Sequence, residues 1–325
     1  MTGLALNPPP LSSSPPDAAP VRWTVLEVIR WTAARFTERA LATPRLDAEL
    51  LVAHALGLPR VQLYVQFDRP LGPDELGAIR ALIKRRQAGE SVAYLVGKKE
   101  FWGVDFTVDA RVLVPRPDTE TLIEEARERL GQRPPEPQEG DAEEAGEAAE
   151  ATPPAVSEPP RIADVGTGSG AIALTLAKLF PGAAVFAGDV SPGALEVARG
   201  NAERLGLAVT FVEGDLAAPL AAHAPFSLVC ANLPYIPSGD MATLPPEVKT
   251  EPALALDGGP DGLALVRRLV GDAPRLLAPG GALVLEIGDG QAGATAELLR
   301  AAGLADVRVR RDLAGVERVV SGVRA

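Results

Sequence analysis

The chain has 325 residues, of which 46% are hydrophobic and only 4% aromatic, and its formal net charge is −11. This length is enough for two domains with apolar cores, and the lack of a basic surplus argues against nucleic acid as the main ligand. One Cys and two scattered His argue against a structural zinc site. No apolar run reaches the length of a membrane span and no signal-peptide pattern opens the chain, so we expect a soluble, cytoplasmic protein without membrane contact.

Isolated reactive side chains are expected to be structural. Cys230 lies inside an apolar run, which predicts a buried strand residue in a reducing compartment and not a nucleophile. His54 is expected to pack near the end of a helix. Because no large patterned apolar surface is evident, we expect a monomer.

The N-terminal third is expected to be helical. Residues 1–20 are rich in Pro, Ser and Ala and are expected to form a disordered leader. Residues 21–90 are expected to form a small helical domain. In it, Thr24 and Glu27 form a capping box, Pro44 opens a second helix, and a third runs over 74–87.

A β-hairpin linker is expected over residues 91–117. The β-prone segments Val104–Val108 and Arg111–Val114 are separated by Asp109 and Ala110, where we expect the turn. Residues 115–117, Pro-Arg-Pro, then hold the chain extended.

A second domain is expected over 118–325, opening on a helix to about Leu130 that Asp118 or Thr119 caps. Residues 131–160 interrupt it as an insertion rich in Glu, Ala and Pro, which we expect to be disordered. Without its eight acidic residues the formal net charge changes from −11 to −3, so the remainder is close to neutral.

From Arg161 onward, strand and helix patterns alternate, which predicts an α/β fold with a parallel sheet and helices on both faces. A final pair of short strands with no helix between them predicts a hairpin, so the last strand should be antiparallel. The expected strands are Arg161–Val165, Ala183–Gly188, Ala208–Val212, Phe226–Cys230, Gly281–Ile287, Val307–Arg310 and Val316–Val320.

A nucleoside-binding pocket is indicated after the first of these strands. Gly166 to Gly170, Gly-Thr-Gly-Ser-Gly, lets the backbone approach a ligand closely, and Asp189 at the end of the second strand can hold ribose hydroxyls. The glycine pattern fits both the dinucleotide fingerprint and S-adenosylmethionine enzymes, so by itself it leaves a nicotinamide cofactor open.

A polar corner follows the fourth strand, at Asn232, Leu233, Pro234 and Tyr235. The Asn232 side-chain oxygen and the Leu233 carbonyl can each accept one N–H of a planar NH2 group, with the Tyr235 ring on its flat face. The corner supplies no evident base for hydride transfer, which favours methyl transfer to nitrogen over a nicotinamide-dependent oxidoreductase.

Together these motifs resemble the PrmC/HemK family, whose members methylate the glutamine side-chain nitrogen of peptide-chain release factors. The resemblance runs from about Val21 to Ala325 apart from the insertion. The segments that carry it are VAYLVGKKEFWG (92–103), VPRPDTE (114–120), DVGTGSGAIAL (164–174), ANLPYIP (231–237), EPALALDGGPDGL (251–263) and LEIGDGQ (285–291).

The resemblance implies a Rossmann-like seven-stranded methyltransferase domain, S-adenosylmethionine as cofactor and the Gly-Gly-Gln motif of release factors as substrate. It also implies that the N-terminal domain and the hairpin recognise the release factor. The family's site falls on Gly166, Thr167, Gly168, Ser169 and Gly170 for the cofactor loop, Asp189 for the ribose, Asp215 and Leu216 for the adenine, and Asn232, Leu233, Pro234 and Tyr235 for the substrate, with Asn232 beside both ligands.

Two residues depart from the family pattern. Leu233 replaces the usual first proline of the tetrapeptide, but the expected hydrogen bond comes from a backbone carbonyl that Leu also has. Leu216 replaces an aromatic residue found in some members. Because Asn-Leu-Pro-Tyr also occurs in ribosomal-RNA adenine dimethyltransferases, adenine-N6 methylation of RNA or DNA is the alternative, although the near-neutral folded part does not favour it.

Overall fold

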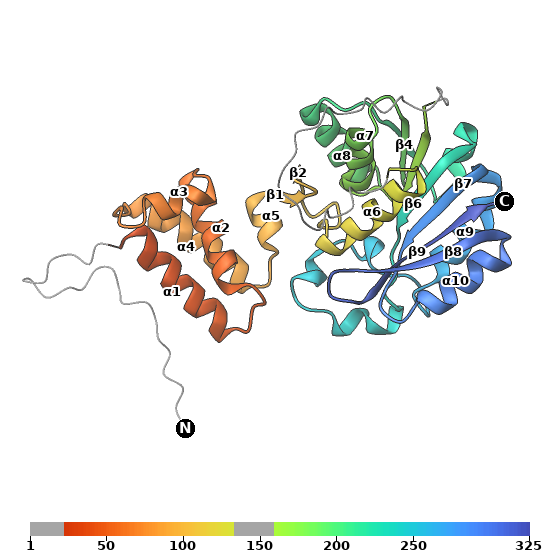
Figure 1. Cartoon of the computed structure of the whole chain (residues 1–325). Helices are drawn as coiled ribbons and strands as arrows, with labels where there is room; N and C mark the ends of the chain where they lie inside the picture. The colour runs from red at the N-terminus through yellow and green to blue at the C-terminus, as the bar shows by residue number, and fades with distance from the viewer. Residues whose placement is uncertain (1–22, 133–158) are drawn as a thin grey trace, which may run out of the picture. The chain divides into compact units, whose positions relative to one another are not determined.

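The computed structural model describes residues 23–132 and 159–325, which form two compact units: the first ends at Val96 and the second begins at Gly97 (Figure 1). The predicted leader over 1–20 lies outside the described residues, as does all but the edges of the predicted insertion over 131–160.

The first unit consists of helices in its described part. They are α1 Val25–Glu38, α2 Pro44–Leu56, α3 Arg60–Val65, α4 Pro73–Gln87 and α5 Val92–Val96. The predicted capping box is confirmed, because the Thr24 hydroxyl accepts the Glu27 N–H while Glu27 accepts the Thr24 N–H at 2.8 Å. Phe36 and Leu51 are fully buried in the core of this unit.

Two expectations for the first unit were wrong or incomplete. His54 is exposed at the C-terminal end of α2 and does not pack into the core, because the buried face of that helix is formed by Leu51 and Val52. The short helices α3 and α5 were not predicted, since six and five residues are too few to display a helical period.

The predicted hairpin exists, but its position was wrong. Its strands are β1 Lys98–Phe101 and β2 Val104–Thr107, paired antiparallel, and the turn falls on Trp102 and Gly103, both with positive φ. Two consecutive positive φ angles are typical of the tight turns that match strand twist. Residues 111–114 form no strand, because Asp109 instead accepts the Arg111 N–H at 3.0 Å and pairs with its guanidinium at 2.7 Å. The hairpin belongs to the second unit.

The second unit contains the predicted Rossmann-like sheet of seven strands, in the order β5-β4-β3-β6-β7-β9-β8. Strands β3 to β7 pair in parallel, and β9 is antiparallel to both β7 and β8, as expected for the final hairpin. The strands are β3 Arg161–Val165, β4 Ala184–Asp189, β5 Thr210–Glu213, β6 Phe226–Asn232, β7 Leu277–Glu286, β8 Leu304–Arg311 and β9 Glu317–Arg324.

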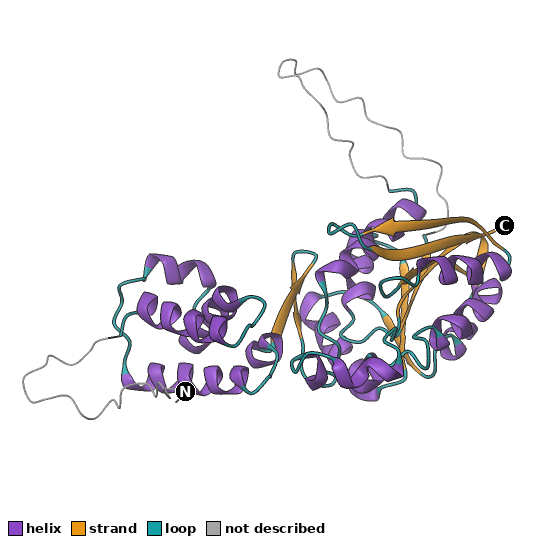
Figure 2. Ribbon diagram, turned by 90° about the horizontal axis from the view of Figure 1, so that it is seen from below, coloured by secondary structure: helices purple, strands orange, loops and turns teal. Residues whose placement is uncertain are grey.

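Helices cover both faces of this sheet (Figure 2). One layer holds α6 Glu120–Arg129, α7 Ala171–Leu179 and α8 Pro192–Leu205, and the other holds α9 Ala264–Leu276 and α10 Ala292–Ala301. Alternate residues of β6 face opposite layers: Leu228 and Cys230 pack with α7, whereas Val229 and Ala231 pack with α9. Cys230 is fully buried, as predicted.

The strand order creates the place for a site. From β3 the chain proceeds to β4 and β5 on one side, and then crosses to β6 and β7 on the other. The carboxyl ends of β3 and β6 therefore meet where the order reverses, which is where open α/β sheets bind ligands. Within 23–132 and 159–325, no helix combines the length and the apolar character that crossing a membrane requires.

Candidate active site

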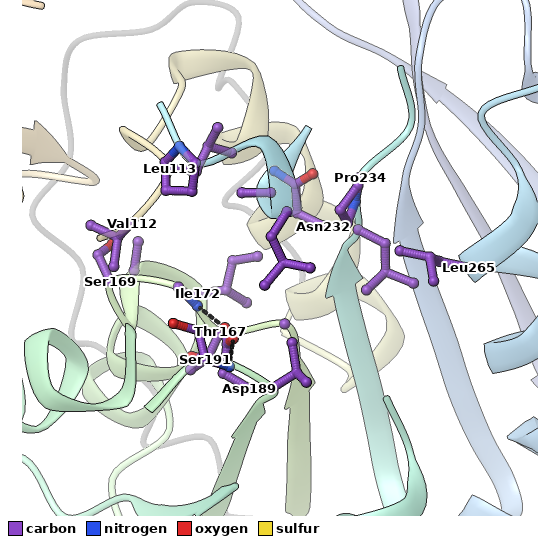
Figure 3. A pocket seen from close by; sticks show the side chains of 18 of the residues that line it. Val112, Leu113, Thr167, Ser169, Ile172, Asp189, Ser191, Asn232, Pro234 and Leu265 are labelled. Atoms are coloured by element: carbon purple, nitrogen blue, oxygen red, sulfur yellow. Dashed lines mark hydrogen bonds between the residues drawn. The ribbon is translucent and has the colours of Figure 1, made fainter. Parts of the chain in front are cut away.

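A pocket of about 340 Å³ lies at this edge of the sheet (Figure 3). Figure 3 shows Asn232 and Pro234 on one side of the pocket, across from Asp189 and Ser191. The loops after β3, β4, β5 and β6 all contribute to its walls, together with residues 111–119, residues 252–255 and the start of α9. The pocket thus brings together segments that are distant in sequence.

The glycine loop after β3 is fixed by backbone hydrogen bonds. The Gly166 and Thr167 N–H groups both donate to the Gly188 carbonyl, at 2.9 and 3.0 Å. Gly166 has φ of +75°, and a β-carbon there would come within 3.3 Å of Leu233 Cδ2. The backbone conformation therefore favours glycine, and a larger residue would press on Leu233 in the corner after β6.

Asp189 ends β4 beside this loop. One of its carboxylate oxygens accepts the Gly168 N–H at 2.9 Å, and the other accepts the Ser191 N–H, also at 2.9 Å. Each oxygen keeps a further lone pair for a ligand. Asp189 also lines the pocket, so its orientation is set before any ligand binds.

Asp164 lies beneath the loop and is completely buried. It accepts hydrogen bonds from the Thr167 hydroxyl at 2.7 Å and from the Ala173 N–H at 3.2 Å. Burial raises the pKa of this carboxyl to about 7, while the two hydrogen bonds oppose the shift and Asp189 adds to it. Asp164 therefore ties the glycine loop to the first turn of α7.

Asp215 and Leu216 line the pocket after β5. The Asp215 carboxylate forms an ion pair with Arg268 of α9, and Leu216 has a positive φ of +48°. The pair joins two walls of the pocket, since Arg268 also lines it.

The corner after β6 divides into two parts. Asn232, Leu233 and Pro234 line the pocket, but Tyr235 does not. A β-carbon on Gly288 would lie 3.1 Å from Tyr235 Cδ2, so the Tyr235 ring lies beside Gly288 after β7, and the Tyr235 carbonyl accepts from Gln291 Nε2 at 2.9 Å. Burial, with a contribution from Glu286, raises the pKa of Tyr235 to about 12. The expectation that this ring packs on the flat face of a bound amide stays a prediction.

Asn232 lies beside two buried residues from other elements. Its Nδ2 donates to the Thr119 hydroxyl at 3.2 Å. Thr119 ends the 3-10 turn Pro117–Thr119 (η1) and stands at the N-cap position of α6, one of the two residues predicted for it, although its side chain makes no capping hydrogen bond. Glu286 stands directly opposite Asn232 in the pairing of β6 with β7.

Glu251, which is 6% exposed, fixes the position of another segment beside the pocket. Its carboxylate accepts the Val114 N–H at 3.1 Å and pairs with Arg116. Burial raises the Glu251 pKa, although Arg116 and the Val114 hydrogen bond oppose the shift. The loop after β6 is thereby fastened to residues 114–116 beside the pocket.

Comparison with known proteins decides the family. Residues 27–97 match the model of the PrmC N-terminal domain, and residues 162–250 match a methyltransferase domain. The release factor glutamine methyltransferase of Geobacter sulfurreducens is 42% identical over 93% of this chain and 98% of its own length. The enzyme of the same name from Moorella thermoacetica is 44% identical over 92% of this chain and 96% of its own length. The chain belongs to the release factor glutamine methyltransferase family.

Solved structures include a release factor-specific protein-(glutamine-N5) methyltransferase from Alicyclobacillus acidocaldarius. It is 30% identical to this chain and covers 67% of it and 99% of the solved chain, with a TM-score of 0.38. The catalytic domain of hMettl16, solved with an RNA hairpin, has a TM-score of 0.50 at 16% identity, covering 77% of this chain and 81% of that one. The second likeness concerns the fold alone.

Family membership makes S-adenosylmethionine the cofactor of this methyltransferase, and the residues present fit it. A β-carbon on Gly166 would occupy the space that the glycine leaves open in this loop. The carboxylate of Asp189 lines the same pocket. Among the described residues, no cluster of three or more His, Cys, Asp or Glu side chains could hold a metal ion.

Sequence reasoning missed Asp164, Thr119, Glu286 and Glu251 as parts of this site. Thr119 stands in VPRPDTE, Asp164 in DVGTGSGAIAL and Glu286 in LEIGDGQ, so each belongs to a segment that carries the family resemblance. Asp164 and Glu286 are carboxylates near the ends of β3 and β7, and this position is the signal that could have identified them.

Proposed function

We propose that this chain transfers the methyl group of S-adenosylmethionine to the glutamine side-chain nitrogen in the Gly-Gly-Gln motif of peptide-chain release factors. Its relatives carry this activity in their names, over nearly the full length of the chain. The single observation that supports it best is the contact between Gly166 and Leu233, because it brings the cofactor loop against the corner that can hold an amide.

The cofactor roles follow from the pocket. The backbone of Gly166, Thr167, Gly168, Ser169 and Gly170 would lie along the amino-acid part of S-adenosylmethionine, and Asp189 would accept the ribose hydroxyls. Asp215 and Leu216 would contact the adenine. The Asp215–Arg268 ion pair supports this placement, since it holds that wall of the pocket in position.

The substrate amide would be held at Asn232 and Leu233. The Asn232 side-chain oxygen and the Leu233 carbonyl would each accept one amide hydrogen, which orients the nitrogen for in-line attack. Pro234 would fix the turn, and Tyr235 would flank the amide. The nitrogen–carbon bond forms as the carbon–sulfur bond breaks, and sulfur keeps the electron pair. Positive charge on nitrogen strengthens both hydrogen bonds, which lowers the barrier, and the excess proton then passes to water.

The first unit would recognise the release factor, together with the hairpin of the second unit. The match of residues 27–97 to the PrmC N-terminal domain supports this assignment. We place the protein in the cytoplasm, where release factors act, as a monomer without direct nucleic-acid binding.

Methyl transfer from labelled S-adenosylmethionine tests the proposal. Release factor, ribosomal RNA and DNA are offered separately to the full chain, with a release factor whose Gly-Gly-Gln glutamine is changed to alanine as the control. We expect label only in the unmodified release factor. Label in RNA or DNA would instead establish the adenine methyltransferase alternative, to which Asn-Leu-Pro-Tyr also corresponds.

A further inference from the structure

We propose that Thr119 and Glu286 are positioning residues for methyl transfer, because they hold the Asn232 carboxamide with its nitrogen turned away from the substrate and its oxygen free to accept. This inference rests on the proposed function, in which the Asn232 oxygen binds the glutamine amide. It adds two residues that neither the motifs nor the tetrapeptide assigned to the reaction.

The three side chains come from separate elements and meet beside the pocket. Thr119 is 4% exposed and Glu286 is 2% exposed, whereas Asn232 is half-buried and lines the pocket. Asn232 Nδ2 donates to Thr119 Oγ1 at 3.2 Å, and Glu286 lies directly opposite Asn232 in the pairing of β6 with β7. The Glu286 Oε2 atom has no hydrogen-bond partner in the described part of the chain.

The chemistry of these groups selects one orientation of the amide. A carboxamide has two ends of nearly equal size, one a donor and the other an acceptor. An ionised carboxylate only accepts, so the NH2 end of Asn232 must face Glu286. The Thr119 hydroxyl can accept from Asn232 and donate its own proton to Glu286. The reversed orientation would set the Asn232 oxygen against a carboxylate and point an N–H at the substrate's N–H groups.

Ionisation of Glu286 controls this selection. Burial raises its pKa to about 7; contact with Thr119, the charge of Arg318 on β9 and contact with Asn232 lower it, and Asp118 in η1 raises it. Arg318 is itself paired with Asp312 at 3.2 Å. Tyr235 also faces the carboxyl, and it is neutral in this range because its own pKa is about 12. A protonated Glu286 can donate to the Asn232 oxygen, so the constraint is lost below pH 7 and methyl transfer should rise with pH through that range.

Steady-state kinetics of four variants test the inference with release factor as substrate. Thr119→Val removes the hydroxyl at nearly constant volume, Thr119→Ser keeps it, and Glu286→Gln supplies a side chain that can both donate and accept. Thr295→Val is the matched control, because Thr295 is fully buried in α10 and its hydroxyl has no partner in the described residues. Turnover, the dissociation constant for S-adenosylmethionine, the melting temperature and the pH profile of kcat are measured for each.

We expect Thr119→Val and Glu286→Gln to lower kcat by about 10- to 100-fold, as loss of a buried hydrogen bond does, with little change in cofactor affinity. Thr119→Ser should restore most of the loss in Thr119→Val, and Glu286→Gln should abolish the rise of kcat near pH 7. Equal turnover in Thr119→Val and Thr295→Val would overturn the inference. So would equal losses in Thr119→Ser and Thr119→Val, or an unchanged pH profile in Glu286→Gln.

Failure of the proposed function gives a different result. In that case the wild-type chain would not label release factor under any condition. The threonine pair keeps the inference testable even if Glu286→Gln does not fold, because serine and valine differ from threonine by one group each.

Discussion

A β-carbon on Gly166 would lie 3.3 Å from Cδ2 of Leu233, so the first residue of the glycine loop and the residue after Asn232 lie side by side. The two residues follow neighbouring parallel strands, β3 and β6, whose carboxyl ends meet at the reversal of strand order. The space available to the glycine loop therefore depends on the position of the corner after β6.

Gly166→Ala should therefore impair methyl transfer as well as stability. The φ of +75° is unfavourable for alanine by about 1–2 kcal/mol, and the new methyl group must displace Leu233. Gly206→Ala is the control, because Gly206 has φ of +66° and a β-carbon added there would meet nothing within 4 Å. We expect similar losses in the free energy of unfolding for both variants, measured by urea denaturation, but a loss of kcat only in Gly166→Ala. Equal activities would show that the contact has no part in catalysis.

Asn232→Ala should lose most methyl transfer. Removing an oriented acceptor at a developing charge costs ~2.7–4 kcal/mol, or about 10²- to 10³-fold in kcat. Binding of S-adenosylmethionine, measured by calorimetry, should fall much less, because the glycine loop and Asp189 remain. Near-wild-type turnover would exclude Asn232 from the reaction.

Asp189→Ala should act on the cofactor instead. The substitution removes the acceptor of the Gly168 and Ser191 N–H groups as well as the proposed ribose contact. We expect the dissociation constant for S-adenosylmethionine to rise by about 10- to 100-fold, the scale of losing a charge-assisted hydrogen bond. Asp272→Ala, which lies in α9 outside the pocket, is the control and should bind normally. Unchanged affinity in Asp189→Ala would remove that residue from the cofactor site.

Asp164 should make the free energy of unfolding depend on pH. Burial raises its pKa from 3.8 to about 7 in the folded chain, so folding favours its protonated form. Its stabilising contribution is complete below pH 3.8 and is lost as pH rises through about 7, a change on the order of 4 kcal/mol. Relative to Asp164→Asn, the wild type should thus lose stability from about pH 4 to 7 and change no further above it.

Asp261→Asn is the control for that titration, measured by the same urea denaturation series. The Asp261 pKa is lowered to about 2, first by its hydrogen bonds with Arg267. Its stabilising contribution is present above pH 3.8 and is lost only as pH falls through about 2. The difference between wild type and Asp261→Asn should stay constant from about pH 4 to 7. A flat difference for Asp164→Asn as well would contradict the raised pKa of Asp164.

Local signals in the chain were sufficient for most of the architecture. The alternation of strands and helices after Arg161, the glycine loop and the acid ending β4 were all predicted, since each depends on residues close together in sequence. The hairpin was placed too late, because its turn at Trp102 and Gly103 lacks the residue pair that usually marks such turns.

The sequence by itself determined the fold class and the family and indicated the residues of the corner after β6, because strand periodicity and short motifs are written in consecutive positions. Only the tertiary structure decided that the Tyr235 ring lies beside Gly288 and that Thr119, 113 residues before Asn232, contacts its carboxamide. Such contacts depend on strand register and on how a 3-10 turn packs across the sheet edge. Register pairs Glu286 of β7 with Asn232 of β6, and no local pattern specifies that pairing.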